Sequence, residues 1–484
     1  MSQHPNGVQP LGNCLLRGGC NIRHPGLGSL AALSDELLLS VLAQVSARSL
    51  VACAGASKAL HCFATHEELW RAMALQECEG RFRFRGTWRR TYLAARAARE
   101  PPPASPPLRA PGLYSDLLHK PHWLATRALD PAWLARDTLP RAAGLSIAEF
   151  RARFEEPNVP VVITGVVNQW PACKRWTHKY LRKAYGGQPA VVANYDMAFG
   201  DYAAYCRGSC DDMPLYLFDS GFAEKAPRLV GDYLVPELFK EDLFQVLGDA
   251  RPAHRWLIVG PQRSGSTFHK DPNATSAWNA VVRGAKKWVL FPPHVIPPGV
   301  HPSADGTEVA TPLSLVEWFA DFYADAQAGE ARPVEGIVRA GELLFVPRGW
   351  WHLAINLEES VAVTHNYLGP VGLPAALAFA RAPAAERLVS GCADRGALAD
   401  RLVAALRQHR PEVLAGLQEQ GQSKRKGACL AELFRGGGNG NPKHRRVSAA
   451  CVRSGEPVIE TGAAVEADAE TGAGFRFNFT ALCN

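Results

Sequence analysis

A histidine and an aspartate stand two residues apart in the segment STFHKDPNATSAWN, at His269 and Asp271. On an extended strand both side chains point to the same side, so they could bind one metal ion. A second histidine, His352, follows an apolar run and a Gly-Trp-Trp turn in GELLFVPRGWWHLAINL. Two imidazoles and one carboxylate form a facial triad, which is typical of non-haem Fe(II) that works with O₂ and a co-substrate. The spacing alone leaves a second interpretation open, in which these are hydrogen-bonded core histidines.

A 2-oxo acid can supply the electrons that such an iron site needs, and its far carboxylate then requires a cation and hydroxyl groups in a fairly dry pocket. Three residues of suitable type occur in apolar segments: Lys286 in RGAKKWVLFP, Thr364 in VAVTHNYL and Tyr216 in PLYLFD. Lys287 is an alternative to Lys286. Strand alternation turns only one of the two lysines inward, and periodicity does not choose between them.

The elements that carry these residues are mainly short strands, between about residues 112 and 370. They are rich in β-branched and aromatic residues and are bounded by Gly, Pro, Asp or Asn. Many short strands with few long helices predict a sandwich or barrel. The predicted strands include PVVITG, AVVANY, PLYLFD, HRWLIVG, KKWVLFP, GIVRA, ELLFVPR and VAVTHNYL.

Residues 112–370 resemble the Jumonji-C family of 2-oxoglutarate oxygenases, in particular its lysyl-hydroxylase and arginine-demethylase branch, once called the phosphatidylserine receptor. PVVITGVVNQWPACKRWT, HRWLIVGPQRSGSTFHKDPNATSAWNAVVRGAKKWVLFPP and the segment around His352 carry this resemblance. It implies a mainly β fold, a double-stranded β-helix (cupin or jelly roll), with Fe(II) at its open mouth.

The resemblance also implies residue roles. His269, Asp271 and His352 would be the iron ligands, and Lys286 would bind the distal carboxylate of 2-oxoglutarate with Thr364 and Tyr216. Asn279 and Asn366 fall on positions that line the co-substrate pocket. Ser266, with Thr267 beside it, stands where the branch has a threonine flanked by glycines, so a hydroxyl is kept and the second glycine is lost.

The chemistry implied by the resemblance is oxidative decarboxylation of 2-oxoglutarate to succinate and CO₂, coupled to hydroxylation of a C–H bond. On an N-methyl carbon the hydroxylated product collapses to formaldehyde, so hydroxylases and demethylases share one reaction. We expect a protein substrate, with a lysine side chain favoured and N-methyl-arginine or N-methyl-lysine as alternatives. Asp271 at the middle ligand favours hydroxylation, because the family's histone demethylases more often have Glu there.

Residues 29–75 are predicted to form three short helices. Ser34 is a candidate N-cap, followed by an apolar stripe that includes Leu37 and Leu38. The stretch resembles an F-box through Leu33 and the closing Leu69-Trp70, with Ser34 in place of the usual Pro. This resemblance implies docking to the adaptor subunit of a cullin-based ubiquitin ligase. A helical cap on the next domain is the alternative.

The remaining segments are assigned from composition. Residues 1–28, rich in Gly, Asn and Pro, are expected to be flexible, and residues 76–111 to form a basic helix and a Pro-rich linker. Residues 371–418 return to helix, which suggests a possible homodimer. Residues 419–484 are predicted to be mostly disordered, apart from alternating Phe475, Phe477 and Phe479, which could form an edge strand.

The whole chain has 484 residues and a net charge of +7, which permits acidic or nucleic-acid partners without requiring them. Twelve cysteines without a CxxC pair indicate reduced thiols, and no signal peptide or membrane span is expected. Nuclear and/or cytoplasmic location is predicted, the nuclear part only from SKRK and PKHRR. Two other functions stay open: an F-box adaptor whose cupin domain mainly binds, and an RNA or nucleotide hydroxylase that uses the Arg-rich stretch 81–99.

Overall fold

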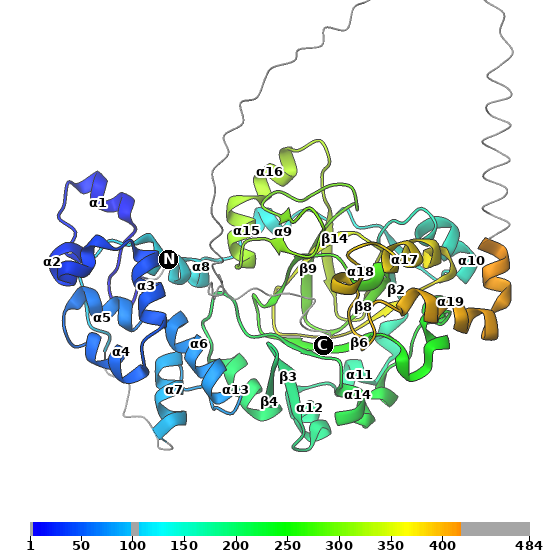
Figure 1. Ribbon diagram of the computed structural model, residues 1–484, viewed down its shortest axis with the longest axis horizontal. Coiled ribbons are helices and arrows are strands. Elements are labelled where there is room, and N and C mark those ends of the chain that lie inside the picture. The colour runs from blue at the N-terminus through cyan, green and yellow to red at the C-terminus, as the bar shows by residue number, and fades with distance from the viewer. Residues whose placement is uncertain (1–2, 98–105, 418–484) are drawn as a thin grey trace, which may run out of the picture. The chain divides into compact units, whose positions relative to one another are not determined.

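The computed structural model describes residues 3–97 and 106–417 of the chain (Figure 1). The contacts divide the chain into two compact units, and the described residues up to 405 all belong to the first. Predictions for the tail 419–484, including its two basic sequences and its edge strand, lie outside the described residues. So does the Pro-rich sequence from 98 to 105.

Short helices form the N-terminal part, as the apolar stripes and serine caps predict (Figure 1). The side chains of Ser34, Ser46 and Ser57 each accept a hydrogen bond from a backbone N–H in the first turn of the helix that follows. No single described helix is long and apolar enough to cross a bilayer, although one bent pair, Arg23–Ala32 with Asp35–Ala43, passes by length and composition. The helices are α1 (Leu11–Arg17), α2 (Arg23–Leu27), α3 (Asp35–Ala43), α4 (Ala47–Cys53), α5 (Lys58–Ala64), α6 (Glu67–Cys78) and α7 (Trp88–Ala97), with a 3₁₀ turn at Gly28–Ala32.

The expectation that residues 1–28 are flexible is wrong for the described residues 3–28. They contain α1 and α2, and Val8 is buried. Gln9 N–H donates to the carbonyl of Leu113 at 3.1 Å, which ties this stretch to the residues after the Pro-rich sequence. The Gly and Asn residues that suggested disorder act instead as caps and turns: Gly18 closes α1 in the left-handed conformation.

Two antiparallel sheets make up the strand-rich part, in agreement with the predicted double-stranded β-helix (Figure 1). The larger sheet has the order β1-β2-β13-β8-β15-β6-β5-β3-β4, and only its β1–β2 pair is parallel. Its strands are β1 (Arg141–Ala143), β2 (Val161–Thr164), β3 (Pro189–Val192), β4 (Tyr195–Ala198), β5 (Leu217–Asp219), β6 (Arg255–Gly260), β8 (Ser276–Arg283), β13 (Leu343–Val346) and β15 (Ser360–Tyr367).

The smaller sheet has the order β12-β9-β14-β7. Its strands are β7 (Gly265–His269), β9 (Ala285–Phe291), β12 (Val334–Arg339) and β14 (Trp351–Asn356), and a separate pair is formed by β10 (His301–Pro302) and β11 (Val309–Ala310). The central strands β9, β14 and β15 are buried along their whole length, including polar residues such as Lys286, His352 and Thr364.

Helices cover the sheets and fill the connections between the strands. The segment TPLSLVEWFADFYADA contains two of them, α15 and α16, and the predicted C-terminal helices are also present. The α-helices are α8 (Asp116–Thr126), α9 (Pro131–Leu134), α10 (Ile147–Phe150), α11 (Pro171–Arg175), α12 (His178–Tyr185), α13 (Phe199–Gly208), α14 (Phe222–Lys225), α15 (Leu315–Asp321), α16 (Tyr323–Ala328), α17 (Leu373–Ala380), α18 (Ala385–Leu388) and α19 (Leu398–His409).

The N-terminal helices and the larger sheet share one apolar core, whereas the sequence suggested a domain of its own at residues 29–75. Polar contacts reinforce this joint. The buried guanidinium of Arg71, on α6, donates to the carbonyl of Met213 at 2.9 Å. The indole of Trp88, on α7, donates to Asp211 at 2.9 Å, and Tyr205 donates to the same carboxylate at 2.7 Å. The residues just before Tyr216 are therefore held by the helices.

Candidate metal and co-substrate site

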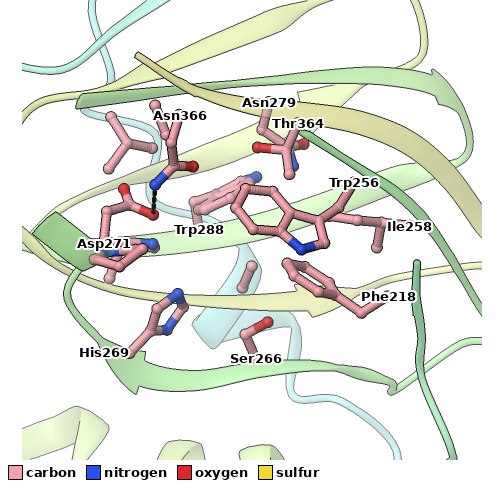
Figure 2. A pocket seen from close by; sticks show the side chains of 15 residues that line it. Phe218, Trp256, Ile258, Ser266, His269, Asp271, Asn279, Trp288, Thr364 and Asn366 are labelled. Atoms are coloured by element: carbon pink, nitrogen blue, oxygen red, sulfur yellow. Dashed lines mark hydrogen bonds between the residues drawn. The ribbon is translucent and has the colours of Figure 1, made fainter. Parts of the chain in front are cut away.

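His269 and His352 meet where two neighbouring strands of the smaller sheet pair. β7 ends at His269, β14 begins just before His352, and the register places the two residues opposite each other. Their ring centroids are 4.1 Å apart. Asp271 follows β7, and the ligand atoms of all three residues lie within 4.8 Å of one another (Figure 2). The structure thus brings together the three residues that the sequence proposed as a triad.

Hydrogen bonds fix which imidazole nitrogen faces the centre of the triad. Nδ1 of His269 lies 2.7 Å from the carbonyl of Thr267, and Nδ1 of His352 lies 3.0 Å from the carbonyl of Trp350. A carbonyl oxygen only accepts, so each Nδ1 carries the proton and each Nε2 presents a lone pair. Burial lowers the pKa of His269 to about 3 and that of His352 to about 4, so both rings are neutral at pH 7 and suited to bind a metal.

The Asp271 carboxylate provides the test of whether a cation fits here. Its Oδ1 accepts a hydrogen bond from Asn366 at 3.3 Å, whereas Oδ2 is buried and has no hydrogen-bond partner among the described residues (Figure 2). Burial raises the pKa of this carboxyl to about 6. A buried carboxylate oxygen without a donor is unfavourable unless a cation compensates it, so the donor set fits a divalent metal ion.

Lys286 lies on the same sheet, further along the barrel from the triad. Along β14, residues 352, 354 and 356 share one face, and Asn356 pairs with Lys286 on β9. The distance along the strand from His352 to that level is therefore about 13 Å. The Lys286 ammonium donates to the phenol oxygen of Tyr216 at 2.7 Å, and burial lowers its pKa to about 7. In the part of the chain that the structure describes, no carboxylate pairs with it.

Lys287 is the residue that sequence periodicity could not separate from Lys286. Its ammonium points to the other face of the sheet and pairs with the buried carboxylate of Glu335 at 2.8 Å. It also donates to the carbonyl of Arg136 at 2.7 Å. Because Lys287 already has a buried anionic partner, Lys286 is the lysine that can receive a ligand's carboxylate.

The two sheets face each other across a cavity that the triad lines. On the larger sheet, Thr364 pairs with Asn279 on one side and with Trp256 on the other, so these three side chains form a row across the wall. Ser266 lies on the opposite wall, and Asn366 lines the cavity beside Asp271 (Figure 2). Thr364 donates to the carbonyl of Trp278, and the side-chain oxygen of Asn279 is buried without a hydrogen-bond partner in the described parts of the chain. Tyr216 lies with Lys286 and is not part of this lining.

The aromatic walls of this cavity were not predicted from the sequence. Phe218, Trp256 and Trp288 line it, and Figure 2 shows Trp256 between Thr364 and Phe218. The indole N–H groups of Trp256 and Trp288 are buried and have no hydrogen-bond partner among the described residues. Strand alternation puts Trp288 on the same face as Lys286, so a position in the cavity wall could have been predicted for Trp288. The place of Trp256 in the cavity wall can be inferred only from its pairing with Thr364 in the folded sheet.

Two family models match the chain: a cupin-like domain over residues 196–370 and an F-box-like domain over residues 33–76. The arginine-specific demethylase JMJ22 of Arabidopsis thaliana is 46% identical over 87% of this chain and 84% of its own length. The chain belongs to the Jumonji-C family of 2-oxoglutarate oxygenases. Lysine-specific demethylase JMJ21 of the same plant is 36% identical over 72% of this chain and 38% of its own length.

A third Jumonji-C relative is the bifunctional arginine demethylase and lysyl-hydroxylase psr-1 of Caenorhabditis elegans. It is 42% identical over 48% of this chain and 62% of its own length. Further family members from animals are named 2-oxoglutarate and iron-dependent oxygenases. The chain is therefore an iron- and 2-oxoglutarate-dependent oxygenase with an F-box-like domain.

In this Jumonji-C site the described residues have separate binding roles. His269, Asp271 and His352 would hold Fe(II), which supplies the oxidation of a C–H bond together with 2-oxoglutarate and O₂. Lys286 and Tyr216 would bind the far carboxylate of 2-oxoglutarate, and the row that includes Thr364 and Asn279 would orient its chain. The apolar and aromatic walls exclude water from the reaction.

Binding of 2-oxoglutarate is expected to take up close to one proton per molecule at pH 8.5 and almost none at pH 6. The pKa of Lys286 is about 7 in the free protein, so its amine is mostly neutral at pH 8.5, and a bound carboxylate favours the charged form. Affinity should therefore fall about tenfold per pH unit above pH 7. Calorimetry of the Mn(II)-loaded protein, in buffers that differ in ionisation enthalpy, measures this uptake.

The matched variants for this experiment are Lys286→Met and Lys287→Met. We expect Lys286→Met to abolish the proton uptake and Lys287→Met to retain it, because Lys287 titrates beside Glu335 and not beside the ligand. A wild-type uptake near zero at pH 8.5 would contradict the assignment of Lys286 as the binding cation.

Proposed function

We propose that this oxygenase modifies basic side chains of proteins, by demethylating N-methyl-arginine or by hydroxylating lysine. The observation that carries the proposal is a cavity lined by the triad, beside a sheet in which Lys286 is buried without a carboxylate partner among the described residues, in a chain 46% identical to JMJ22. The name of JMJ22 supports arginine demethylation, and that of psr-1 supports both reactions. N-methyl-lysine is a further candidate because of the similarity to JMJ21.

The aromatic walls support a cationic substrate. Phe218, Trp256 and Trp288 line the same cavity as the triad. The faces of aromatic rings attract ammonium and guanidinium groups, and Trp is the most effective of them. A lysine or arginine side chain that entered the cavity would place its aliphatic part against these rings, which suits oxidation of one of its C–H bonds.

Product analysis tests this proposal. Peptides that carry lysine, N-methyl-lysine or N-methyl-arginine would be incubated with the enzyme, Fe(II), ascorbate and 2-oxoglutarate, with the His352→Ala variant as control. Hydroxylation adds the mass of one oxygen atom, whereas demethylation removes a methylene mass and releases formaldehyde. Steady succinate release with no change in any of the peptide classes would overturn the proposal that the substrate is a basic protein side chain.

We also propose that the F-box-like helices bind the adaptor subunit of a cullin-type ubiquitin ligase. The sequence grouped Leu37 and Leu38 in one stripe, but on α3 Leu37 is 57% exposed and Leu38 only 1%. Val41, one turn after Leu37, is also exposed. Exposed apolar side chains at helical spacing support a partner on this face.

Leu37→Glu is therefore expected to abolish capture of the purified adaptor without a change in melting temperature. The matched substitution Leu38→Ala removes a buried side chain and should lower the free energy of unfolding by about 2–5 kcal/mol. Pull-down and thermal unfolding measure the two effects. Equal adaptor capture by wild type and Leu37→Glu would remove this face as the docking site.

RNA oxidation, a homodimer through the helices of 371–418, and nuclear and/or cytoplasmic location stay predictions. Part of the Arg-rich stretch already pairs with acidic side chains: Arg81 lies 2.7 Å from Glu79, and Arg96 lies 3.6 Å from Glu77. These pairs reduce the positive charge available to an RNA backbone, so the protein substrate is the preferred proposal.

A further inference from the structure

The loop after the carboxylate ligand is bonded to a segment that lies 117 residues later in the chain. The side-chain amide of Asn273 donates through Nδ2 to the carbonyl of Ser390 at 3.0 Å. Its Oδ1 accepts from the backbone N–H of Ser390, also at 3.0 Å. Asn273 is 3% exposed and Ser390 is 1% exposed. We call this buried two-point contact the Asn273–Ser390 clamp.

The loop that the clamp holds has an unfavourable backbone conformation. Asn273 and Ala274 are consecutive non-glycine residues with φ values of 58° and 51°, in the left-handed region. Such a conformation persists only where surrounding contacts determine it. Ala274 has no polar side chain to form such contacts, so the amide of Asn273 is the group through which the neighbouring segment can fix the turn.

The turn is also connected directly to the ligand. Asn366 donates to Asp271 at 3.3 Å and to the hydroxyl of Thr275 at 3.0 Å (Figure 2 shows the first bond). Thr275 donates in turn to the carbonyl of Pro272 at 2.7 Å. A shift of the loop at Asn273 would therefore move the Asp271 carboxylate, whose second oxygen is the one without a partner.

The segment at the other end of the clamp has its own anchors. Val389 is fully buried, and the carbonyl of Gly391 accepts from the backbone N–H of Ala253 at 2.7 Å. Gly391 has φ +75°, and a Cβ there would lie 2.8 Å from the Ala253 nitrogen, so only glycine fits without displacement. Residues 389–391 thus join the metal loop to the backbone that leads into β6.

We propose that the Asn273–Ser390 clamp positions Asp271, so that metal affinity depends on residues 389–391, beyond the last strand of the barrel. Asn273 touches neither metal nor substrate in this assignment and acts as a positioning residue. The inference concerns the metal site alone and does not depend on which side chain the enzyme oxidises. Supporting contacts of this kind typically change metal affinity 10- to 100-fold.

Asn273→Gly is the test variant, because glycine keeps the left-handed conformation and removes both hydrogen bonds. Anaerobic titration of the full chain with Co(II) should show a dissociation constant raised about 10- to 100-fold. The matched control is Asn21→Gly. Asn21 makes the same two-point contact with the backbone of Tyr114, at 2.8 and 3.2 Å, in the N-terminal part of the chain. Loss of this two-point contact in Asn21→Gly should leave the affinity for Co(II) within twofold of wild type.

A second variant acts from the other side of the clamp. Gly391→Ala leaves the metal loop intact and pushes residues 389–391 away from Ala253, so it should also weaken Co(II) binding. If either folded variant bound Co(II) within twofold of wild type, with a melting temperature lowered as in Asn21→Gly, the clamp would be a structural contact only and the proposal would be wrong.

Discussion

Replacing Lys286 with methionine is expected to raise the KM for 2-oxoglutarate by roughly 30-fold to several thousand-fold, because removing one partner of a buried charge pair costs about 2–5 kcal/mol. Methionine keeps the apolar stem and removes the ammonium. The carboxylate of the co-substrate would then lose its cationic partner and keep the phenol of Tyr216. Initial rates of succinate formation, measured against 2-oxoglutarate concentration, give the KM directly.

Lys287→Met is the control for this result, since it removes the same charge from the next residue. That substitution breaks the buried pair with Glu335, which keeps its contacts with Arg136 and Tyr323, so the free energy of unfolding should fall by at most about 3–5 kcal/mol. We expect the KM of the folded Lys287→Met fraction to match that of wild type. A raised KM in Lys287→Met with a normal KM in Lys286→Met would reverse the assignment of the two lysines.

His352→Ala is expected to abolish succinate formation and bound iron together. The substitution removes one of three protein ligands, so the loss of metal affinity should exceed the ~10- to 100-fold change that supporting residues cause. Metal content per chain and anaerobic Co(II) spectra measure binding, and succinate release measures turnover.

The matched control is His365→Asn. His365 is also buried, but it lies on the outer face of the larger sheet, where its ring stacks on Trp278 at 4.4 Å and bonds to the phenol of Tyr233. This variant should keep its iron. Iron-dependent succinate release that survived in His352→Ala would refute the triad.

The sequence predicted strands such as β9 and β15, because they are rich in β-branched and aromatic residues and are bounded by turn residues, whereas β14 was not among the predicted strands. The candidate triad could also be proposed, since His269 and Asp271 lie two apart and His352 follows a strand. The choice between Lys286 and Lys287 could not be made. It depends on which face of β9 looks toward the opposite sheet, and that is a property of the tertiary fold.

Two other features could not be predicted from the sequence, because they also depend on the tertiary fold. Trp256 joins the site through its register with Thr364, and register is set by the whole sheet. Residues 3–28 have the composition of a flexible segment, but their Gly and Asn residues make caps and turns whose partners, such as Tyr114, lie about 90 positions away. Composition reports neither kind of long-range pairing.

The joint between α6 and the residues before Tyr216 limits how this protein can be recombined. Buried Arg71 needs the carbonyl of Met213, and the indole of Trp88 needs the carboxylate of Asp211. A chimaera that received foreign helices in place of α6 and α7 would leave Asp211 without its indole donor, with Tyr205 still bonded to it, and helices excised alone would lose the carbonyl acceptor for a buried guanidinium. Exchange of domains at this junction would therefore lower the stability of the protein. We expect the N-terminal helices and the strand-rich part to be inherited together, and to need expression as one chain in the laboratory.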